Sequence, residues 1–147
     1  MTQEEKDLLL VDLCSRLPYH CRIFYEYVDD LDNKIYGYNK TYGYNLTLNT
    51  RCIDEFNADN VVVKPYLRPM SSMTEEERKE VNNLIKDNRP IPYGKINNKG
   101  VDNLLSSVAV TSSILIDWLN AHHFDYRDLI GKGLALEAPD GMYNLNK

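Results

Sequence analysis

Residues 18–27, Pro-Tyr-His-Cys-Arg-Ile-Phe-Tyr-Glu-Tyr, contain the change of pattern that decides the fold. Pro18 ends a preceding helical segment, because the residue before a proline is pushed out of the helical region. From His20 onward the apolar side chains recur at every second position, which places them on one face of an extended strand. The members of that face are Cys21, Ile23, Tyr25 and Tyr27. The stretch therefore predicts a strand with one covered face.

Upstream of this stretch, residues 3–17 are predicted to form a helix. Thr2 and Glu5 have the spacing of a capping box, which satisfies two of the free N–H groups at a helix start. The apolar positions that follow have helical spacing, since they recur every third or fourth residue. They are Leu9, Leu10, Leu13, Cys14 and Leu17.

Downstream, three further segments are predicted to be strands, and residues 42–53 among them alternate again, with Asn49 on the polar face. The predicted strands are 34–38, 42–53 and 61–67, separated by the polar turns 29–33 and 57–60. Short strands joined by short polar turns favour an antiparallel meander or a small barrel. Pro65 cannot donate to a strand ladder, so the last strand is expected at an edge or to end near this residue.

The pattern returns to helical spacing at Thr74. Thr74 and Glu77 form a second capping box, and the predicted helix ends near Asn88, ahead of Pro90 and Pro92. Residues 90–100 are predicted to be a loop. The segment 101–123 is rich in β-branched residues, but the length of its apolar run favours a helix.

A last short helix is predicted from a cap at Asp125 through Leu129 and Ile130. Gly131 and Gly133 follow it and supply a left-handed exit.

The totals indicate one domain over residues 1–147. The formal net charge of −5 argues against a dominant phosphate-binding surface, although a local basic patch remains possible. No apolar run is long enough for a membrane helix, and the acidic N-terminus does not resemble a secretory signal. We therefore expect a cytoplasmic protein whose three cysteines are reduced.

Tyrosine is the abundant aromatic residue, with 11 copies against three Phe and one Trp. Four of these tyrosines, spaced by small polar residues, are the best candidate for an interaction surface, because Tyr gives contact area at low entropic cost. They are Tyr36, Tyr38, Tyr42 and Tyr44. The alternative is that these rings simply pair across a hairpin.

A basic bias in the middle of the chain gives a second candidate surface, for nucleic acid. Its members are Lys64, Tyr66, Arg68 and Arg89. Cationic groups beside an aromatic ring are suited to binding single-stranded DNA or RNA, because they contact its phosphates and stack on its bases. Glutamates 75–77 and Glu80 are interleaved with nearby cations, which favours a mixed, solvated surface instead.

No metal site, cofactor motif or catalytic residue is predicted. His122 and His123 are adjacent, and neighbouring residues on a helix do not face one another, so a position at a helix C-terminus fits them better. Cys14, His20, Cys21 and Cys52 lack the spacing of a zinc site. Nucleophile elbows, phosphate-binding loops and dinucleotide fingerprints are absent from the sequence.

Several blocks of the chain resemble a family of small uncharacterised proteins encoded in gut Bacteroidetes genomes and in their phages and prophages. The resemblance rests on residues 17–19 (Leu-Pro-Tyr), 64–77, 117–127, 133–139 and 141–143. Residues 30–60 and 89–113 depart from it. The resemblance implies a bacterial or phage cytoplasmic setting, and it transfers no activity and no catalytic residue.

The expected fold is α+β: an N-terminal helix, a small antiparallel sheet or barrel over about residues 20–68, then two or three C-terminal helices. The expected core is Leu10, Leu13, Ile23, Tyr25, Leu46, Leu48, Val62, Trp118, Leu119, Phe124 and Ile130. The leading hypothesis for function is a non-enzymatic accessory module that binds a protein partner. A nucleic-acid-binding small barrel and a small-ligand-binding enzyme are the alternatives.

Overall fold

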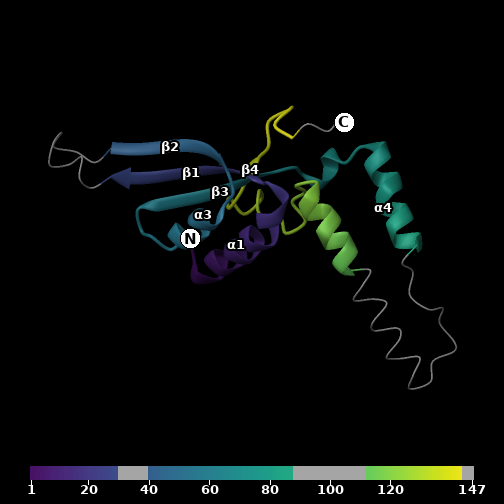
Figure 1. Ribbon diagram of the computed structural model, residues 1–147, viewed down its shortest axis with the longest axis horizontal. Helices are drawn as coiled ribbons and strands as arrows, with labels where there is room; N and C mark the ends of the chain where they lie inside the picture. The colour runs from purple at the N-terminus through teal and green to yellow at the C-terminus, as the bar shows by residue number, and fades with distance from the viewer. Residues whose placement is uncertain (30–39, 88–111, 144–147) are drawn as a thin grey trace, which may run out of the picture. The chain divides into compact units, whose positions relative to one another are not determined.

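The computed structural model describes residues 1–29, 40–87 and 112–143 (Figure 1). The chain divides into two compact units, Met1–Pro69 with His123–Lys147 and Met70–His122. The larger unit holds a β-sheet with its covering helices, and the smaller unit holds two helical segments. The expectation of one domain over residues 1–147 stays a prediction.

The first helix, α1 (Gln3–Arg16), begins at the predicted capping box. The Thr2 hydroxyl accepts from the Glu5 N–H at 3.1 Å, and the Glu5 carboxylate accepts from the Thr2 N–H at 2.7 Å. A short 3-10 turn, η1 (Leu17–Tyr19), carries Pro18 and ends the helix. His20 has a left-handed φ of 55°, which turns the chain from the helix into the first strand.

The sheet has four strands in the order β2-β1-β3-β4, which places β2 at one edge (Figure 1). The strands β1 (Arg22–Asp29), β2 (Lys40–Thr47) and β3 (Val61–Leu67) are antiparallel, and the two-residue β4 (Leu136–Glu137) runs parallel to β3. The α+β prediction is confirmed. Of its two alternatives, the open sheet is the one that forms, because β2 and β4 lie at opposite ends of the order and do not pair.

The three strands predicted after the first have different outcomes. The strand predicted over 61–67 is confirmed in full, but the one predicted over 42–53 is wrong beyond Thr47. Residues Thr50–Glu55 form the helix α3 instead, because the Asn49 side chain caps it by accepting from the Cys52 N–H at 3.2 Å. The strand predicted over 34–38 lies outside the described residues.

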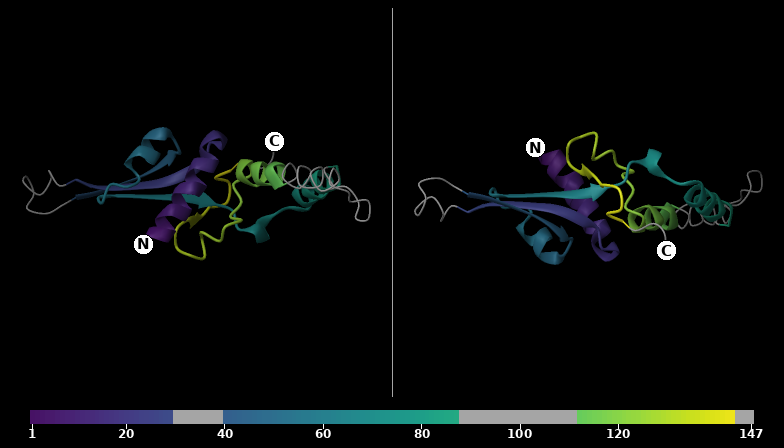
Figure 2. Two further views of the ribbon diagram at one scale, coloured as in Figure 1. Left: turned by 90° about the horizontal axis from the view of Figure 1, so that it is seen from below. Right: turned by 90° about the horizontal axis from the view of Figure 1, so that it is seen from above.

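The core of the larger unit lies between one face of the sheet and the helices α1 and α3, and Figure 2 shows α3 against one side of the strands. We call this side the covered face; it carries the odd-numbered residues of β1 and β3. Its packed members include Leu9, Leu13, Ile23, Tyr25, Leu48, Cys52, Phe56, Val63 and Leu67.

Most of the expected core is confirmed, with one clear error. Leu10, Leu46 and Ile130 are partly buried against the core, while Phe124 is fully buried. Val62 is 38 % exposed, because its even position in β3 places it on the second face of the sheet. Trp118 and Leu119 are half-buried and belong to the smaller unit.

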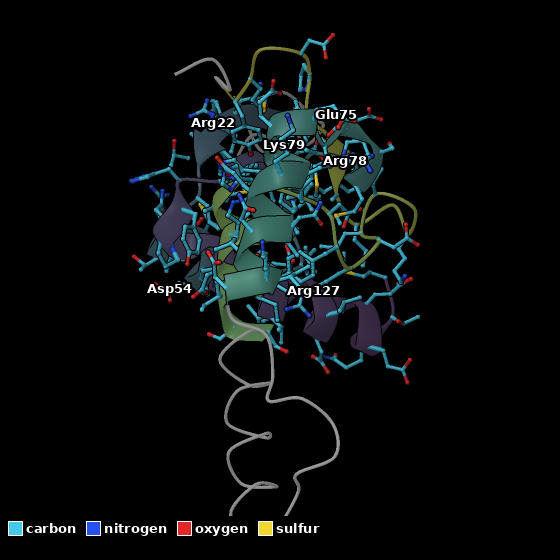
Figure 3. The ribbon with its side chains drawn as sticks, turned by 90° about the vertical axis from the view of Figure 1, so that its right-hand side faces the viewer. Arg22, Asp54, Glu75, Arg78, Lys79 and Arg127 are labelled. Atoms are coloured by element: carbon cyan, nitrogen blue, oxygen red, sulfur yellow. The ribbon has the colours of Figure 1, made fainter. Side chains whose placement is uncertain are left out.

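The smaller unit contains η2 (Met70–Ser72), α4 (Glu75–Asp87) and a helical segment over residues 112–121. The second capping box is confirmed, since the Thr74 hydroxyl accepts from the Glu77 N–H at 3.2 Å. Trp118 of the helical segment donates its indole N–H to the Glu80 carboxylate of α4 at 3.0 Å. Figure 3 shows Glu75, Arg78 and Lys79 projecting from α4, whose surface carries charges of both signs. The predicted helix over 101–123 is helical from residue 112, and its earlier part lies outside the described residues.

The helix predicted from Asp125 to Ile130 is wrong, since residues 125–135 form a series of turns. The Asp125 carboxylate does accept backbone N–H groups, from Leu129 at 2.8 Å and Ile130 at 2.9 Å. Asp128, however, has a left-handed φ of 57°, which prevents a helical run. Gly133 has the expected left-handed φ, at 72°.

Candidate functional site

Four tyrosines from two strands form a stacked row on the covered face. The register of β1 and β2 places Tyr25 opposite Tyr44 and Tyr27 opposite Tyr42. The ring centroid of Tyr27 lies 5.2 Å from that of Tyr42 and 6.2 Å from that of Tyr44, and both pairs are stacked. Tyr25 and Tyr27 are 6.2 Å apart and tilted. We call Tyr25, Tyr27, Tyr42 and Tyr44 the tyrosine row.

Two of the four predicted interaction residues belong to this row. Tyr42 and Tyr44 lie on β2, whereas Tyr36 and Tyr38 lie outside the described residues. Their ring partners come from β1, so the cross-strand pairing considered as the alternative does occur, with Tyr25 and Tyr27. Tyr44 is nevertheless 45 % exposed, while Tyr25 is only 9 % exposed. The row therefore runs from the core to the surface.

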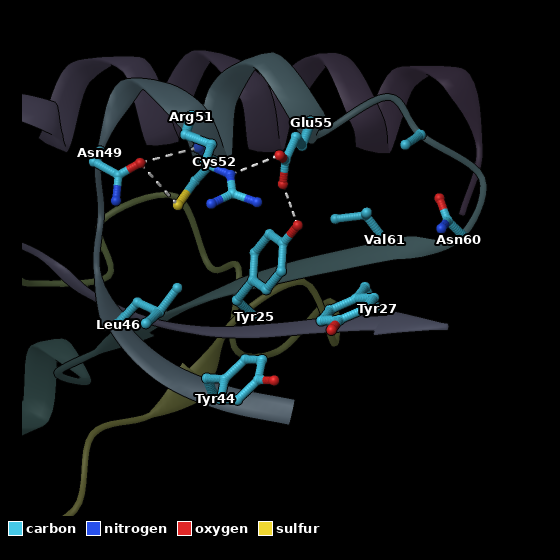
Figure 4. A pocket seen from close by; sticks show the side chains of 11 residues that line it. Tyr25, Tyr27, Tyr44, Leu46, Asn49, Arg51, Cys52, Glu55, Asn60 and Val61 are labelled. Atoms are coloured by element: carbon cyan, nitrogen blue, oxygen red, sulfur yellow. Dashed lines mark hydrogen bonds and ion pairs between the residues drawn. The ribbon is translucent and has the colours of Figure 1, made fainter. Parts of the chain in front are cut away.

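A cavity of about 730 Å³ lies between the sheet and α3 and uses the tyrosine row as one wall (Figure 4). Its opposite side is formed by α3 and the turn that follows. The lining residues are Tyr25, Tyr27, Tyr44, Leu46, Asn49, Arg51, Cys52, Glu55, Ala58, Asn60 and Val61. Its volume is in the range typical of sites for small molecules, and it exceeds what a single side chain would fill.

One hydrogen-bonded chain crosses this cavity from the sheet to α3. The Tyr25 hydroxyl donates to one oxygen of Glu55, and the other oxygen accepts from Arg51 Nε at 2.7 Å (Figure 4). Desolvation and the bond to Glu55 raise the pKa of Tyr25 to about 12. The bond from Arg51, aided by the one from Tyr25, lowers the pKa of Glu55.

These shifts set the charges of the two groups in the cavity. At neutral pH Tyr25 is a neutral hydroxyl, and Glu55 is an ionised carboxylate each of whose oxygens accepts one hydrogen bond. The Arg51 side chain is 81 % exposed, and no described residue bonds its two terminal nitrogens, so it offers a cationic group at the cavity mouth.

Sequence reasoning missed Arg51, Cys52 and Glu55, because it treated residues 50–53 as strand. A signal for them exists: Asn49 is a good helix cap, and Arg51 and Glu55 have the i, i+4 spacing of a helical ion pair.

The described residues of the nucleic-acid alternative differ in exposure, and the alternative stays a prediction. Lys64 and Tyr66 share the second face of the sheet, and the Tyr66 hydroxyl donates to the Asn45 side chain at 3.0 Å. Arg68 is only 6 % exposed, with its guanidinium 4.2 Å from the centre of the Phe124 ring. Arg89 lies outside the described residues.

The edge of the sheet at β3 and β4 is built mainly from segments far apart in sequence. Arg68 and Phe124 form a parallel bridge, in which the Arg68 N–H donates to the His123 carbonyl and the Asp125 N–H donates to the Arg68 carbonyl, both at 2.8 Å. The Ala138 N–H donates to the Leu67 carbonyl at 2.8 Å. We call β3, β4 and the residues 123–143 packed against them the closed edge.

Tyr143 and a buried ion pair complete the closed edge. The Tyr143 hydroxyl donates to the Tyr66 carbonyl at 2.7 Å and accepts from the Arg22 N–H at 2.9 Å. Arg16 of α1 is fully buried, pairs with Asp12 at 2.7 Å and donates to the Phe124 carbonyl at 2.8 Å. These groups connect chain segments and hold them in place.

The three cysteines form no disulfide bond with one another. Cys14 is exposed, while Cys21 and Cys52 are buried. Burial raises the pKa of the Cys21 thiol to about 11, against a smaller lowering by Tyr143, so the thiol is protonated at neutral pH. Within residues 1–29, 40–87 and 112–143, no three His, Cys, Asp or Glu side chains lie close enough to share a metal ion.

None of the helices in the described part of the chain has both the length and the apolar character needed to cross a membrane. Comparison with known protein families, with curated proteins and with solved structures finds no match for this chain. The tyrosine row and its cavity are therefore interpreted from their own geometry.

Proposed function

We propose that this chain is a non-enzymatic binding module that takes an apolar side chain of a protein partner into the cavity beneath α3. The observation that carries the proposal is the cavity of about 730 Å³ with the tyrosine row as its wall. Aromatic anchors in pockets dominate the energetics of many protein interfaces, and Tyr is enriched among them.

Three features support an apolar occupant. The wall combines aromatic rings with Leu46 and Val61, which favour burial of another apolar group. The polar groups that cross the cavity, Tyr25 and Glu55, already satisfy one another. Tyr44, at 45 % exposure, still has surface to lose on binding.

A protein partner is favoured over nucleic acid by charge as well. The formal net charge is −5. Of the basic residues proposed to bind nucleic acid, Arg68 packs its guanidinium against the Phe124 ring. The proposed setting is the bacterial cytoplasm, where exposed thiols such as Cys14 stay reduced.

A small-molecule ligand is the second candidate, favoured by the same cavity, whose volume would hold one. It would use the same aromatic wall and the same exposed Arg51. The two candidates differ in whether a protein is captured.

The first test uses a defined mimic of an apolar side chain, N-acetyl-tryptophanamide, titrated into isotope-labelled protein and followed by NMR. We expect shifts confined to cavity residues such as Leu46, Ala58 and Val61, with Val62 on the second face unmoved. Leu46→Arg, which fills the cavity, should abolish the shifts. Shifts spread over both faces, or none at millimolar probe, would refute the cavity as the site.

The second test compares Tyr44→Ser with Tyr66→Ser, two tyrosines of one sheet on opposite faces. Capture of a protein partner from bacterial cytoplasm should fall at least about 30-fold with Tyr44→Ser, the loss expected for an anchor worth about 2 kcal/mol. Tyr66→Ser should leave capture unchanged. If Tyr66→Ser alone lost binding, and the bound material were DNA or RNA released by salt, the nucleic-acid alternative would replace the proposal.

A further inference from the structure

The two edges of the sheet are protected to very different degrees. At one edge the terminal strand β4 has only two residues and is followed by Pro139, and short edge strands and prolines both discourage further pairing. At the other edge β2 has eight residues, all in unbroken register with β1 from Arg22–Thr47 to Asp29–Lys40. We call the outer side of β2 the open edge.

The hydrogen bonding of β2 shows which backbone groups face outward. The Leu48 N–H donates to the Cys21 carbonyl at 2.8 Å, so these two residues form a hydrogen-bonded pair. Pairs of this kind alternate along an antiparallel ladder. The backbone groups of residues 42, 44 and 46 therefore point to β1, and those of 41, 43, 45 and 47 point to the open edge.

The open edge carries little of the usual protection against pairing. Lys40 at the start of β2 is its one charged residue, the strand contains no proline, and the unbroken register leaves no room for a bulge. Among the described residues, two of the four outward carbonyls have a side-chain donor that a second strand would displace: Asn45 from Arg22 at 3.5 Å, and Thr47 from Asn49 at 3.3 Å. The outward N–H groups have no such partner within the described chain.

The sequence of β2 is complementary to itself about Tyr44. If two copies pair antiparallel with Tyr44 opposite Tyr44, then Thr41 meets Thr47 and Gly43 meets Asn45. These are the outward-facing residues, so they fall in the hydrogen-bonded positions of the new ladder. On the covered face, Tyr42 meets Leu46 and Tyr44 meets its counterpart, which are aromatic and apolar pairs of the kind that stabilise sheets.

We propose that the chain forms a two-fold homodimer by antiparallel pairing of β2 with β2 of a second copy, centred on Tyr44. In this pairing the outward backbone groups of each copy face those of the other. Polar residues meet polar residues, and the covered faces of the two sheets lie on the same side. An unrelated strand would match all three features only by chance. The pairing joins the two sheets and brings the tyrosine rows together, so each copy adds aromatic surface beside the cavity of the other.

The test uses opposite charges at the two-fold position. Tyr44→Glu and Tyr44→Lys each place like charges directly opposite one another, which destabilises the pair. Each variant alone should sediment as a monomer, and an equimolar mixture should sediment as a dimer, as the wild type does. Val62→Glu and Val62→Lys, on the second face of β3, serve as controls and should both stay dimeric.

Cross-linking gives an independent readout that does not depend on the charged variants folding. In a background of Cys14→Ser, Tyr44→Cys should form a disulfide-linked dimer on mild oxidation, because non-hydrogen-bonded pairs have Cα atoms about 4.5 Å apart, within disulfide reach. Tyr42→Cys should not, since it faces Leu46. Dimers linked through position 42 instead would overturn the register.

A wild type that is monomeric at the highest soluble concentration overturns the proposal, as does a dimer that persists in both Tyr44→Glu and Tyr44→Lys. The inference goes beyond the proposed function, and the two fail separately. Sedimentation reports the pairing of copies, whereas the N-acetyl-tryptophanamide titration reports the cavity.

Discussion

The closed edge and the open edge belong to one small sheet, yet they use opposite physical strategies. At the closed edge, side chains such as Arg16 and Phe124 are fully buried, and backbone groups of β3 bond to segments more than fifty residues away. At the open edge, Tyr44 and the outward backbone of β2 are exposed to solvent. Buried long-range contacts are thus concentrated at one edge, while the other edge keeps aromatic surface accessible.

Long-range contacts explain why the closed edge is costly to disturb. Removing a buried group there leaves cavities or unsatisfied partners in several segments at once. At the open edge most groups retain access to water, so their loss has a smaller penalty. Paired substitutions at the closed edge and elsewhere in the sheet test this difference.

The largest effect is expected from Phe124→Ala. Phe124 is fully buried beneath the Arg68 guanidinium, so its loss should lower the free energy of unfolding by about 3–5 kcal/mol. Its counterpart Phe24→Ala, on the half-buried second face of β1, should cost about half as much. Chemical denaturation of both variants measures the contrast, and equal losses would contradict it.

A smaller effect is expected from Tyr143→Phe. The change removes a hydroxyl that serves both the Tyr66 carbonyl and the Arg22 N–H, which should cost about 1–3 kcal/mol. Tyr44→Phe, at the open edge, should change stability by less than about 0.5 kcal/mol. Thermal and urea unfolding of the two hydroxyl deletions give the comparison directly. A neutral Tyr143→Phe would show that this contact does not stabilise the closed edge.

A further loss, of about 1 kcal/mol at neutral pH for one hydrogen bond, is expected from Tyr25→Phe. Its signature is a pH dependence. The pKa of Tyr25 is raised to about 12 in the folded protein from an ordinary value near 10, so the stability it contributes is complete below pH 10 and is lost as pH rises towards 12. The stability difference between wild type and Tyr25→Phe should therefore shrink over that interval. A constant difference would mean that Tyr25 is not held protonated by its surroundings.

Acid should weaken the same hydrogen-bonded group of Tyr25, Glu55 and Arg51 by protonating Glu55. Its pKa is lowered in the folded state by Arg51 and Tyr25, so its contribution is present above the ordinary carboxyl pKa and is lost as pH falls through the lowered one. Glu55→Gln, measured beside Tyr25→Phe, separates the acidic limb of the stability profile from the alkaline limb.

Local signals predicted the elements that depend on them. Thr2 with Glu5 and Thr74 with Glu77 mark the starts of α1 and α4, because a cap acts over three residues. The bounds predicted for the last strand, Val61 to Leu67, match β3 in full, although Val62 was expected on its buried face. The strand predicted to continue to Ile53 failed because Asn49 was assigned to the polar side of a strand, whereas its side chain caps a helix.

The candidate site was predicted only in part, for the same reason. Tyr42 and Tyr44 stood out by composition, but their ring partners Tyr25 and Tyr27 were expected only as members of a covered face. Arg51 and Glu55 became part of the site only through α3, whose position over the sheet follows from burial of Cys52 and Phe56 in the core.

By itself the sequence determined the α+β class, the starts of α1 and α4 and the covered face of β1, since these follow from spacing within a few residues. Tertiary structure alone decided that β4, two residues long, pairs with β3, that Asp125 supports turns and not a helix, and that the cavity forms beneath α3. The physical reason is distance along the chain. Contacts such as Arg68 with Phe124 and Tyr143 with Arg22 join segments that no local pattern relates.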